Sequence, residues 1–180
     1  MSALAEQIGR KRFWLLAGLF FLPVALGLFY VWFFGVNVPY WDEWELVSFL
    51  KNAQTSGLSF SSLFAQHNEH RIVFPLLAML PIIFLSGFNV VAQMYVTFGM
   101  FTGMLAVVAA VFLRRFHPAA IAPYLPLAAF VIFSLSQYEN MLWGFQLGFV
   151  MAAFSSLFVF YCVDRACGDE DSFSAGWLAA

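Results

Sequence analysis

The chain has 180 residues, of which 63% are hydrophobic, 20% aromatic and only 10% charged, and its formal net charge is −2. Its mean hydropathy of +0.84 is far above that of a soluble domain of this length. The composition therefore excludes an ordinary water-soluble domain. It predicts an all-α, polytopic helical membrane protein.

The first predicted element is a membrane helix over residues 13–36, an uncharged run long enough to span ~30 Å of hydrocarbon. Arg10, Lys11 and Arg12 directly precede it. The run is longer than the apolar core of a cleaved signal peptide, and its end is bulky where a cleavage site has small residues. We expect an uncleaved signal-anchor with a cytoplasmic N-terminus, because Lys and Arg favour the inside.

Residues 37–71 are predicted to form an outer loop of short amphipathic helices on the membrane surface. Asp42 and Glu45 match a capping box that starts the first of these helices. It should stop near Gly57, and a second short helix should end at Gln66. One face of the first helix is expected to carry Trp44, Val47 and Leu50, with Trp41 and Trp44 at headgroup depth.

The later apolar blocks are residues 72–88, 90–113, 119–136 and 142–163. Pro75 and Pro81 interrupt the first of them, and proline breaks or bends a helix. If that block is re-entrant or lies on the surface, every Lys and Arg except Lys51 and Arg71 is cytoplasmic. We therefore favour four crossings. Five remain open, since the block is apolar enough to span when tilted.

The C-terminal part offers little chemistry. Cys162 and Cys167, four residues apart with no His nearby, predict reduced structural thiols rather than a zinc site. Residues 168–171 are acidic and predict a solvated loop. Residues 173–180 resemble the opening of another apolar helix, so we expect the chain to be an N-terminal fragment of a longer one.

Function is expected where charge gathers at the membrane edge, because polar clusters are costly there. Asp42 and Glu43 lie between Trp41 and Trp44. A carboxylate in this place can take a proton from an acceptor hydroxyl or hold a divalent metal. The alternatives are a helix cap for Asp42 and a solvated loop position for Glu43.

A second polar motif, Gln66-His-Asn-Glu-His-Arg71, precedes the 72–88 block. His67, Glu69 and His70 are candidates for part of a metal site, or for a phosphate site shared with Arg71. The Arg71 guanidinium matches a lipid phosphate in fork geometry. The alternatives are a hydrogen-bonded turn and an arginine that snorkels to lipid headgroups.

The third motif precedes the last apolar block. Glu139, Trp143 and Gln146 share one face of a continuous helix by their spacing. A polar stripe beside a tryptophan predicts a cavity wall on which a sugar ring can stack. Alternatively, Glu139 only provides a favourable charge at a helix N-terminus.

In their order and spacing, these motifs resemble the C-type integral-membrane glycosyltransferases. That superfamily includes protein O-mannosyltransferases and the bacterial transferases that add aminoarabinose to lipid A. The resemblance covers residues 10–163, the N-terminal module of the family. It lies in Trp41-Asp42-Glu43-Trp44 after the first helix, Phe112-Leu-Arg-Arg-Phe116, Tyr138-Glu139-Asn140, and a His-Asn-Glu-His-Arg stretch seen in bacterial members. The second acidic motif departs from the common Arg…Asp pattern.

The resemblance implies transfer of a hexose or pentose from a polyprenyl-phosphate donor to a hydroxyl acceptor on the non-cytoplasmic face. It places the chain in a bacterial inner membrane. Expected partners are the lipid-linked donor and membrane lipids, with no nucleic acid. The implied catalytic residues are Asp42, Glu43 and Glu139, with a divalent metal held by Asp42 and Glu139. From their own chemistry and positions, the candidate substrate-binding residues are Arg71, His67, His70, Trp143 and Gln146.

Two other classes of protein remain open. A non-catalytic membrane scaffold or assembly subunit fits the short chain, since so few helices need not close an active site. A transporter is favoured less, because transporters place charges within helices or use discontinuous helices in paired halves. The predicted spans carry no charge near their middles.

Overall fold

The computed structural model describes residues 2–67 and 71–167, and this part of the chain is all-α, as predicted. The helices and 3₁₀ turns are α1 (Ser2–Phe34), α2 (Glu43–Ser56), α3 (Phe60–Leu63), α4 (Val73–Ser86), α5 (Val90–Arg115), α6 (Pro118–Ile121), α7 (Tyr124–Ile132), η1 (Leu135–Gln137), α8 (Tyr138–Leu142), η2 (Gly144–Gln146) and α9 (Leu147–Cys167).

Three segments in the described ranges are long and apolar enough to cross a membrane: Gly9–Phe34, Val90–Arg115 and Gly144–Ala166. Each coincides closely with a predicted span. Their outward surfaces remain apolar, with Trp14 67% and Phe160 72% exposed. Side chains of this size stay exposed in a stable protein where lipid rather than water surrounds them, so the architecture is that of a membrane protein.

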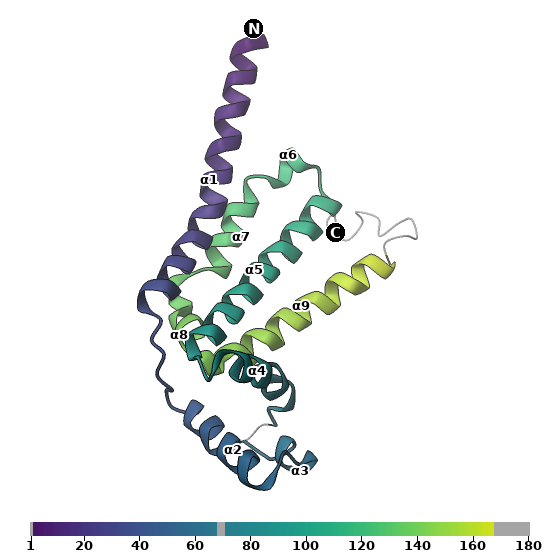
Figure 1. Ribbon diagram of the computed structural model, residues 1–180. Helices are drawn as coiled ribbons and strands as arrows, with labels where there is room; N and C mark the ends of the chain where they lie inside the picture. The colour runs from purple at the N-terminus through teal and green to yellow at the C-terminus, as the bar shows by residue number, and fades with distance from the viewer. Residues whose placement is uncertain (1, 68–70, 168–180) are drawn as a thin grey trace.

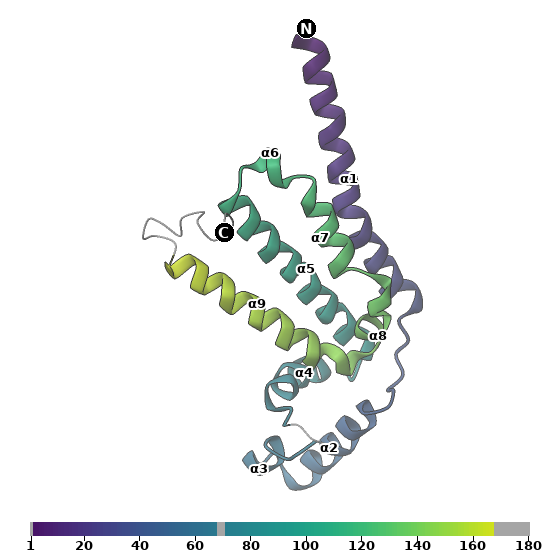
Figure 2. The same ribbon diagram turned by 180° about the vertical axis from the view of Figure 1, so that it is seen from behind.

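The predicted continuous span over residues 119–136 is not formed as one helix. α6 begins at Pro118 and ends at Ile121, and α7 begins after Pro123 and has nine residues. Proline lacks the N–H that an unbroken helix needs, which accounts for the break. By itself α7 covers only ~14 Å. Nevertheless, it runs back beside α1 and α5 (Figures 1 and 2).

The described helices form a bundle with two distinct ends (Figures 1 and 2). α5 leads to α6 at one end, α7 returns to α8 at the other, and α9 leads back again. α2, α3 and α4 gather at the same end as α8. The described residues of all three polar motifs therefore belong to one end of the molecule, which we call the α2–α8 end.

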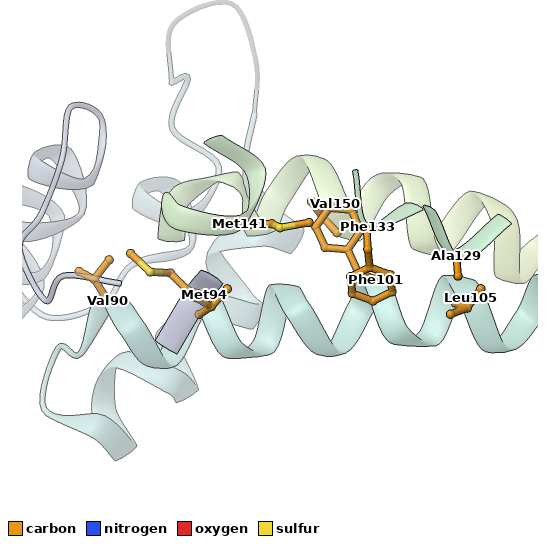
Figure 3. Close-up of a cluster of buried hydrophobic side chains, with 9 residues drawn as sticks. Val90, Met94, Phe101, Leu105, Ala129, Phe133, Met141 and Val150 are labelled. Carbon is orange, nitrogen blue, oxygen red and sulfur yellow. The ribbon is translucent and has the colours of Figure 1, made fainter. Parts of the chain in front are cut away.

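The centre of the bundle is a cluster of apolar side chains from α1, α5, α7, α8 and α9 (Figure 3). The Phe101 and Phe133 rings meet there with centroids 6.0 Å apart. A Cβ atom on Gly103 would lie 2.8 Å from the Phe154 ring, so the absent side chain lets α9 approach α5 closely. Close approach through small residues is a common way for helices to associate in a membrane.

At the far end of α5 and α9, the Arg115 guanidinium pairs with Asp164. This ion pair joins the two helices where their apolar stretches end. Cys162 is a free thiol on α9, as predicted, whereas the side chain of Cys167 lies outside the described part.

A second apolar cluster joins α2 to α4 and to the start of α9. α2 ends at Ser56 before Gly57, close to the predicted stop, and α3 is the predicted second helix, although it ends at Leu63. The sequence did not predict which side of α2 packs against the rest of the protein. Glu43 and Leu46 are buried, whereas Trp44 is 57% exposed.

Candidate functional site

Glu43 connects α2 to the turn that precedes α9. Its Oε2 atom accepts the Tyr40 N–H (2.8 Å), and its Oε1 atom accepts the Phe145 N–H (3.0 Å). The residue is only 1% exposed. The solvated loop position considered for Glu43 is therefore wrong. Burial raises the pKa of the Glu43 carboxyl, and hydrogen bonds from the backbone of Tyr40, Phe145 and Gly144 offset part of that rise.

Gly144 makes room for this carboxylate. A Cβ atom at Gly144 would lie 2.6 Å from Oε1 of Glu43 and 3.0 Å from the Val90 side chain. The preceding residue, Trp143, has an extended backbone (φ −119°, ψ 110°), and its indole N–H donates to the Tyr40 carbonyl (3.2 Å). The chain between α8 and α9 is thus shaped to receive the Tyr40–Glu43 segment.

This extended residue corrects one prediction. Residues 139–146 are not one continuous helix, because α8 stops at Leu142 and η2 follows Trp143. Glu139, Trp143 and Gln146 consequently do not share a helix face. Glu139 and Trp143 still line one cavity, whereas Gln146 is half-buried in η2 and is not among the described residues that line it.

The cavity that holds Glu139 and Trp143 has a volume of about 340 Å³ and is mostly aromatic, and we call it the aromatic cavity. Its lining residues are Tyr40, Trp41, Tyr138, Glu139, Leu142 and Trp143. The Trp143 ring meets Tyr40 and Trp41 edge to face, with centroids 5.7 and 6.0 Å apart. The Tyr138 hydroxyl donates to Oε1 of Glu139 (3.0 Å), which raises the pKa of Tyr138.

Trp41 has a strained backbone in this wall. Its φ is +47°, in the left-handed region that side chains other than glycine rarely adopt. Such strain persists only where surrounding contacts maintain it, and it is concentrated at functional sites. The hydrogen bonds of Tyr40 and Glu43 on either side of Trp41 supply those contacts.

Beside the aromatic cavity lies a group that we call the carboxylate–histidine cluster, made of Asp42, Glu45 and His67. Nδ1 of His67 lies 2.6 Å from Oε2 of Glu45, and its Nε2 lies 3.8 Å from Oδ2 of Asp42. One possible ligand atom from each residue lies within 4.8 Å of the others, a spacing that suits a metal ion.

The cluster replaces the predicted capping box. Asp42 occupies the N-cap position of α2 but makes no side-chain capping bond there. Instead, its carboxylate and that of Glu45 both approach His67. Glu45 was considered only as a capping partner, so its place in a candidate site was missed. Its position one helical turn after Asp42 was the available signal.

A row of rings connects the cluster to the aromatic cavity. Trp41 contacts Trp143, Trp143 stacks on Phe145 with centroids 6.1 Å apart, and Phe145 lies 5.2 Å from the His67 ring. A smaller cavity of about 130 Å³ lies beside His67, with Glu45, Phe145 and Ile72 among its lining residues. The carboxylate–histidine cluster and the aromatic cavity therefore belong to one continuous site.

The structure describes only some of the remaining predicted site residues. Arg71 is exposed directly before Ile72, which lines the cavity beside His67. Glu69 and His70 lie outside the described residues. Asn37, which the sequence did not single out, accepts the Val90 N–H through Oδ1 (2.8 Å) and fixes the end of α1 to the start of α5.

No protein-family model matches the chain, and neither do the curated proteins or the solved structures with which it was compared. Function is therefore inferred from the geometry of the site.

Proposed function

We propose that the chain is a membrane glycosyltransferase that moves a sugar from a polyprenyl-phosphate donor to a hydroxyl acceptor. The observation that carries the proposal is the aromatic row from Trp41 to His67. It places an aromatic cavity of sugar size directly beside a carboxylate–histidine cluster. Sugar binding needs the first feature and hydroxyl activation needs the second.

The aromatic cavity suits a sugar ring. The indoles of Trp41 and Trp143 offer apolar surfaces to the C–H face of the sugar, and Glu139 with the Tyr138 hydroxyl offers hydrogen-bonding groups to its hydroxyls. Pockets that combine apolar walls with a few placed polar groups are the usual form of small-molecule sites.

Asp42 is the proposed general base. Its side chain is 37% exposed, so an acceptor hydroxyl can reach it. As Asp42 takes the hydroxyl proton, the acceptor oxygen forms a bond to the anomeric carbon and the bond from that carbon to the phosphate oxygen breaks. The phosphate leaves with the electron pair and needs charge neutralisation rather than a proton. Arg71 is the proposed cation for that phosphate.

The proposed membrane arrangement has a cytoplasmic N-terminus and four crossings of a bacterial inner membrane. It is supported by the alternating directions of α1, α5, the α6–α7 segment and α9, and by the position of α4 at the α2–α8 end (Figure 1). With Arg10, Lys11 and Arg12 inside, the site would face the non-cytoplasmic side. A lipid donor would then enter at headgroup depth.

The test is sugar transfer by full-length Asp42→Asn with a polyprenyl-phosphate-linked donor. Asp42 makes no capping bond, so the variant should keep its helicity and thermal unfolding while losing transfer. Gln54→Ala, an exposed change on the same helix, is the matched control. Wild-type turnover by Asp42→Asn would remove Asp42 from the chemistry. Failure of the wild-type protein to use any such donor would favour a non-catalytic scaffold.

A further inference from the structure

His67 contains a buried nitrogen with no hydrogen-bond partner in the described part of the chain. The side chain is only 12% exposed, and its Nδ1 is engaged by Glu45 at 2.6 Å. Nε2 is fully shielded from solvent and makes no hydrogen bond there. Buried polar atoms are almost always paired, so this exception requires an explanation.

The partner of Nδ1 decides the state of Nε2. An ionised carboxylate can only accept hydrogen bonds, so the 2.6 Å contact with Glu45 places the proton of a neutral imidazole on Nδ1. Nε2 then presents a lone pair. The nearest carboxylate oxygen, Oδ2 of Asp42, is also an acceptor and lies 3.8 Å away, beyond hydrogen-bonding range. In this neutral form of His67, two electron-pair donors, Nε2 and Oδ2 of Asp42, face each other.

A bound cation resolves this arrangement. Metal bonds to a histidine nitrogen and a carboxylate oxygen are each about 2.0–2.2 Å, so one ion can reach both atoms. Metal-binding histidines usually donate their other N–H to a carboxylate, which fixes the ring and its tautomer, and here the Glu45 carboxylate is that acceptor.

We propose that Oδ2 of Asp42 and Nε2 of His67 bind a divalent transition metal ion, with Glu45 orienting the imidazole. A mixed nitrogen and oxygen ligand set favours ions such as Zn²⁺, Co²⁺ or Mn²⁺ over Ca²⁺ and Mg²⁺, which prefer oxygen alone. Two protein ligands would leave coordination positions open, and a cavity of about 130 Å³ adjoins His67. The proposal does not depend on sugar transfer, because its readout is metal binding.

The experiment is a titration of the purified full chain in detergent, stripped of metal, with Co²⁺ followed by its visible absorption and then displaced by Zn²⁺. Wild-type protein should show one saturable site, and Zn²⁺ should raise its unfolding temperature. His67→Gln and Asp42→Asn should lose the saturable signal. Glu45→Gln should weaken binding by about 10- to 100-fold, as expected for a residue that orients a ligand.

Two variants are matched controls. His117→Gln changes an exposed histidine near α6, at the other end of the bundle, and should bind Co²⁺ as wild type does. Glu139→Gln should also retain binding. If Glu139→Gln loses the site while His67→Gln keeps it, the ligands are instead Asp42 and Glu139, and the proposal is overturned.

Folding of each variant is checked by size-exclusion chromatography and circular dichroism. Glu45 is 58% exposed, so its substitution should leave the fold intact even if His67→Gln does not. Absence of a saturable Co²⁺ signal in the wild-type chain, or unchanged affinity in a folded Glu45→Gln variant, refutes the proposed geometry.

Discussion

The carboxylate of Glu43 occupies the space beside Gly144 in which every other amino acid has a Cβ atom. The distance from that hypothetical atom to Oε1 is 2.6 Å, and the same oxygen accepts the N–H of Phe145. The start of α2 is therefore fixed to the turn before α9 by one carboxylate and one missing side chain. This contact also holds Trp41, two residues before Glu43, against Trp143.

Gly144→Ala should destabilise the protein by about 1–3 kcal/mol, the usual cost of adding a methyl group to a filled space. Because the new atom displaces Glu43, sugar transfer should fall as well. Thermal unfolding in detergent measures the first effect. The matched control is Gly99→Ala on α5, where nothing lies within 4 Å of a new Cβ atom. Equal stabilities for the two variants would contradict the close contact at Gly144.

The raised pKa of Glu43 predicts a stability that depends on pH. In the folded protein Glu43 holds its proton more tightly than at the ordinary value of 4.5. The stabilisation of the folded state that comes from this raised pKa is therefore fully present below pH 4.5. It is lost as the pH rises through the raised pKa. Relative to Glu43→Gln, which does not titrate at this position, the unfolding temperature of the wild-type protein should fall as the pH rises through that interval. A difference between the two proteins that is constant with pH would show that the pKa is not raised.

Trp143→Ala should weaken sugar binding in the aromatic cavity by about 2- to 10-fold, equivalent to the ~0.5–1.5 kcal/mol of an aromatic contact. Trp143→Phe keeps a ring but loses the N–H donated to the Tyr40 carbonyl, so it should have an intermediate effect. The measurement is the apparent KM for the lipid-linked donor. Trp44→Ala removes an exposed tryptophan from α2, outside the aromatic cavity, and should leave KM unchanged.

Arg71→Ala should raise the apparent KM for the donor by about 10- to 100-fold, since a hydrogen bond to a charged group contributes ~1.5–3 kcal/mol. Arg71→Lys should have a smaller effect, because an ammonium offers no fork to two phosphate oxygens. Acceptor affinity should not change. Lys51→Ala, which removes an exposed charge from α2, is the control. An unchanged donor KM in Arg71→Ala would leave Arg71 as an anchor to lipid headgroups.

Single cysteines at Asn52 and Ser136 should react with an impermeant reagent from the non-cytoplasmic side, and one at His117 should be protected. The background carries serine in place of Cys162 and Cys167. Asn52 and Ser136 are both exposed and belong to the α2–α8 end, whereas His117 lies at the other end. Labelling at 52 with protection at 136 would establish five crossings instead.

Hydrophobic run length was sufficient to predict the long helices. The blocks at 13–36, 90–113 and 142–163 each yielded one, because an uncharged run of that length has few stable alternatives to a helix. The prediction of one continuous helix over 119–136 was wrong, because a proline inside an apolar run can end a helix, as a polar loop does. Pro123 stands at the break between α6 and α7, although hydropathy alone does not distinguish this block from its neighbours.

The candidate site was predicted at the level of motifs but not of partners. That Asp42, His67 and Trp143 belong together near one end of the molecule followed from their places between apolar blocks. The role of Glu43 could not be predicted, since its partner is the backbone of a residue far along the chain. The side of α2 that packs inward could not be predicted for a related reason, because a buried carboxylate lies where apolar residues are expected.

The contact between Glu43 and Phe145 also imposes an order on biosynthesis. The two residues are 102 positions apart, so α2 emerges from the ribosome long before its anchor exists. α4 is available earlier as an apolar neighbour, but the Glu43 carboxylate stays hydrated until η2 has been made. Dehydration of this one side chain therefore waits until η2 has been synthesised, and nascent chains that end before Phe145 should expose α2 to proteolysis.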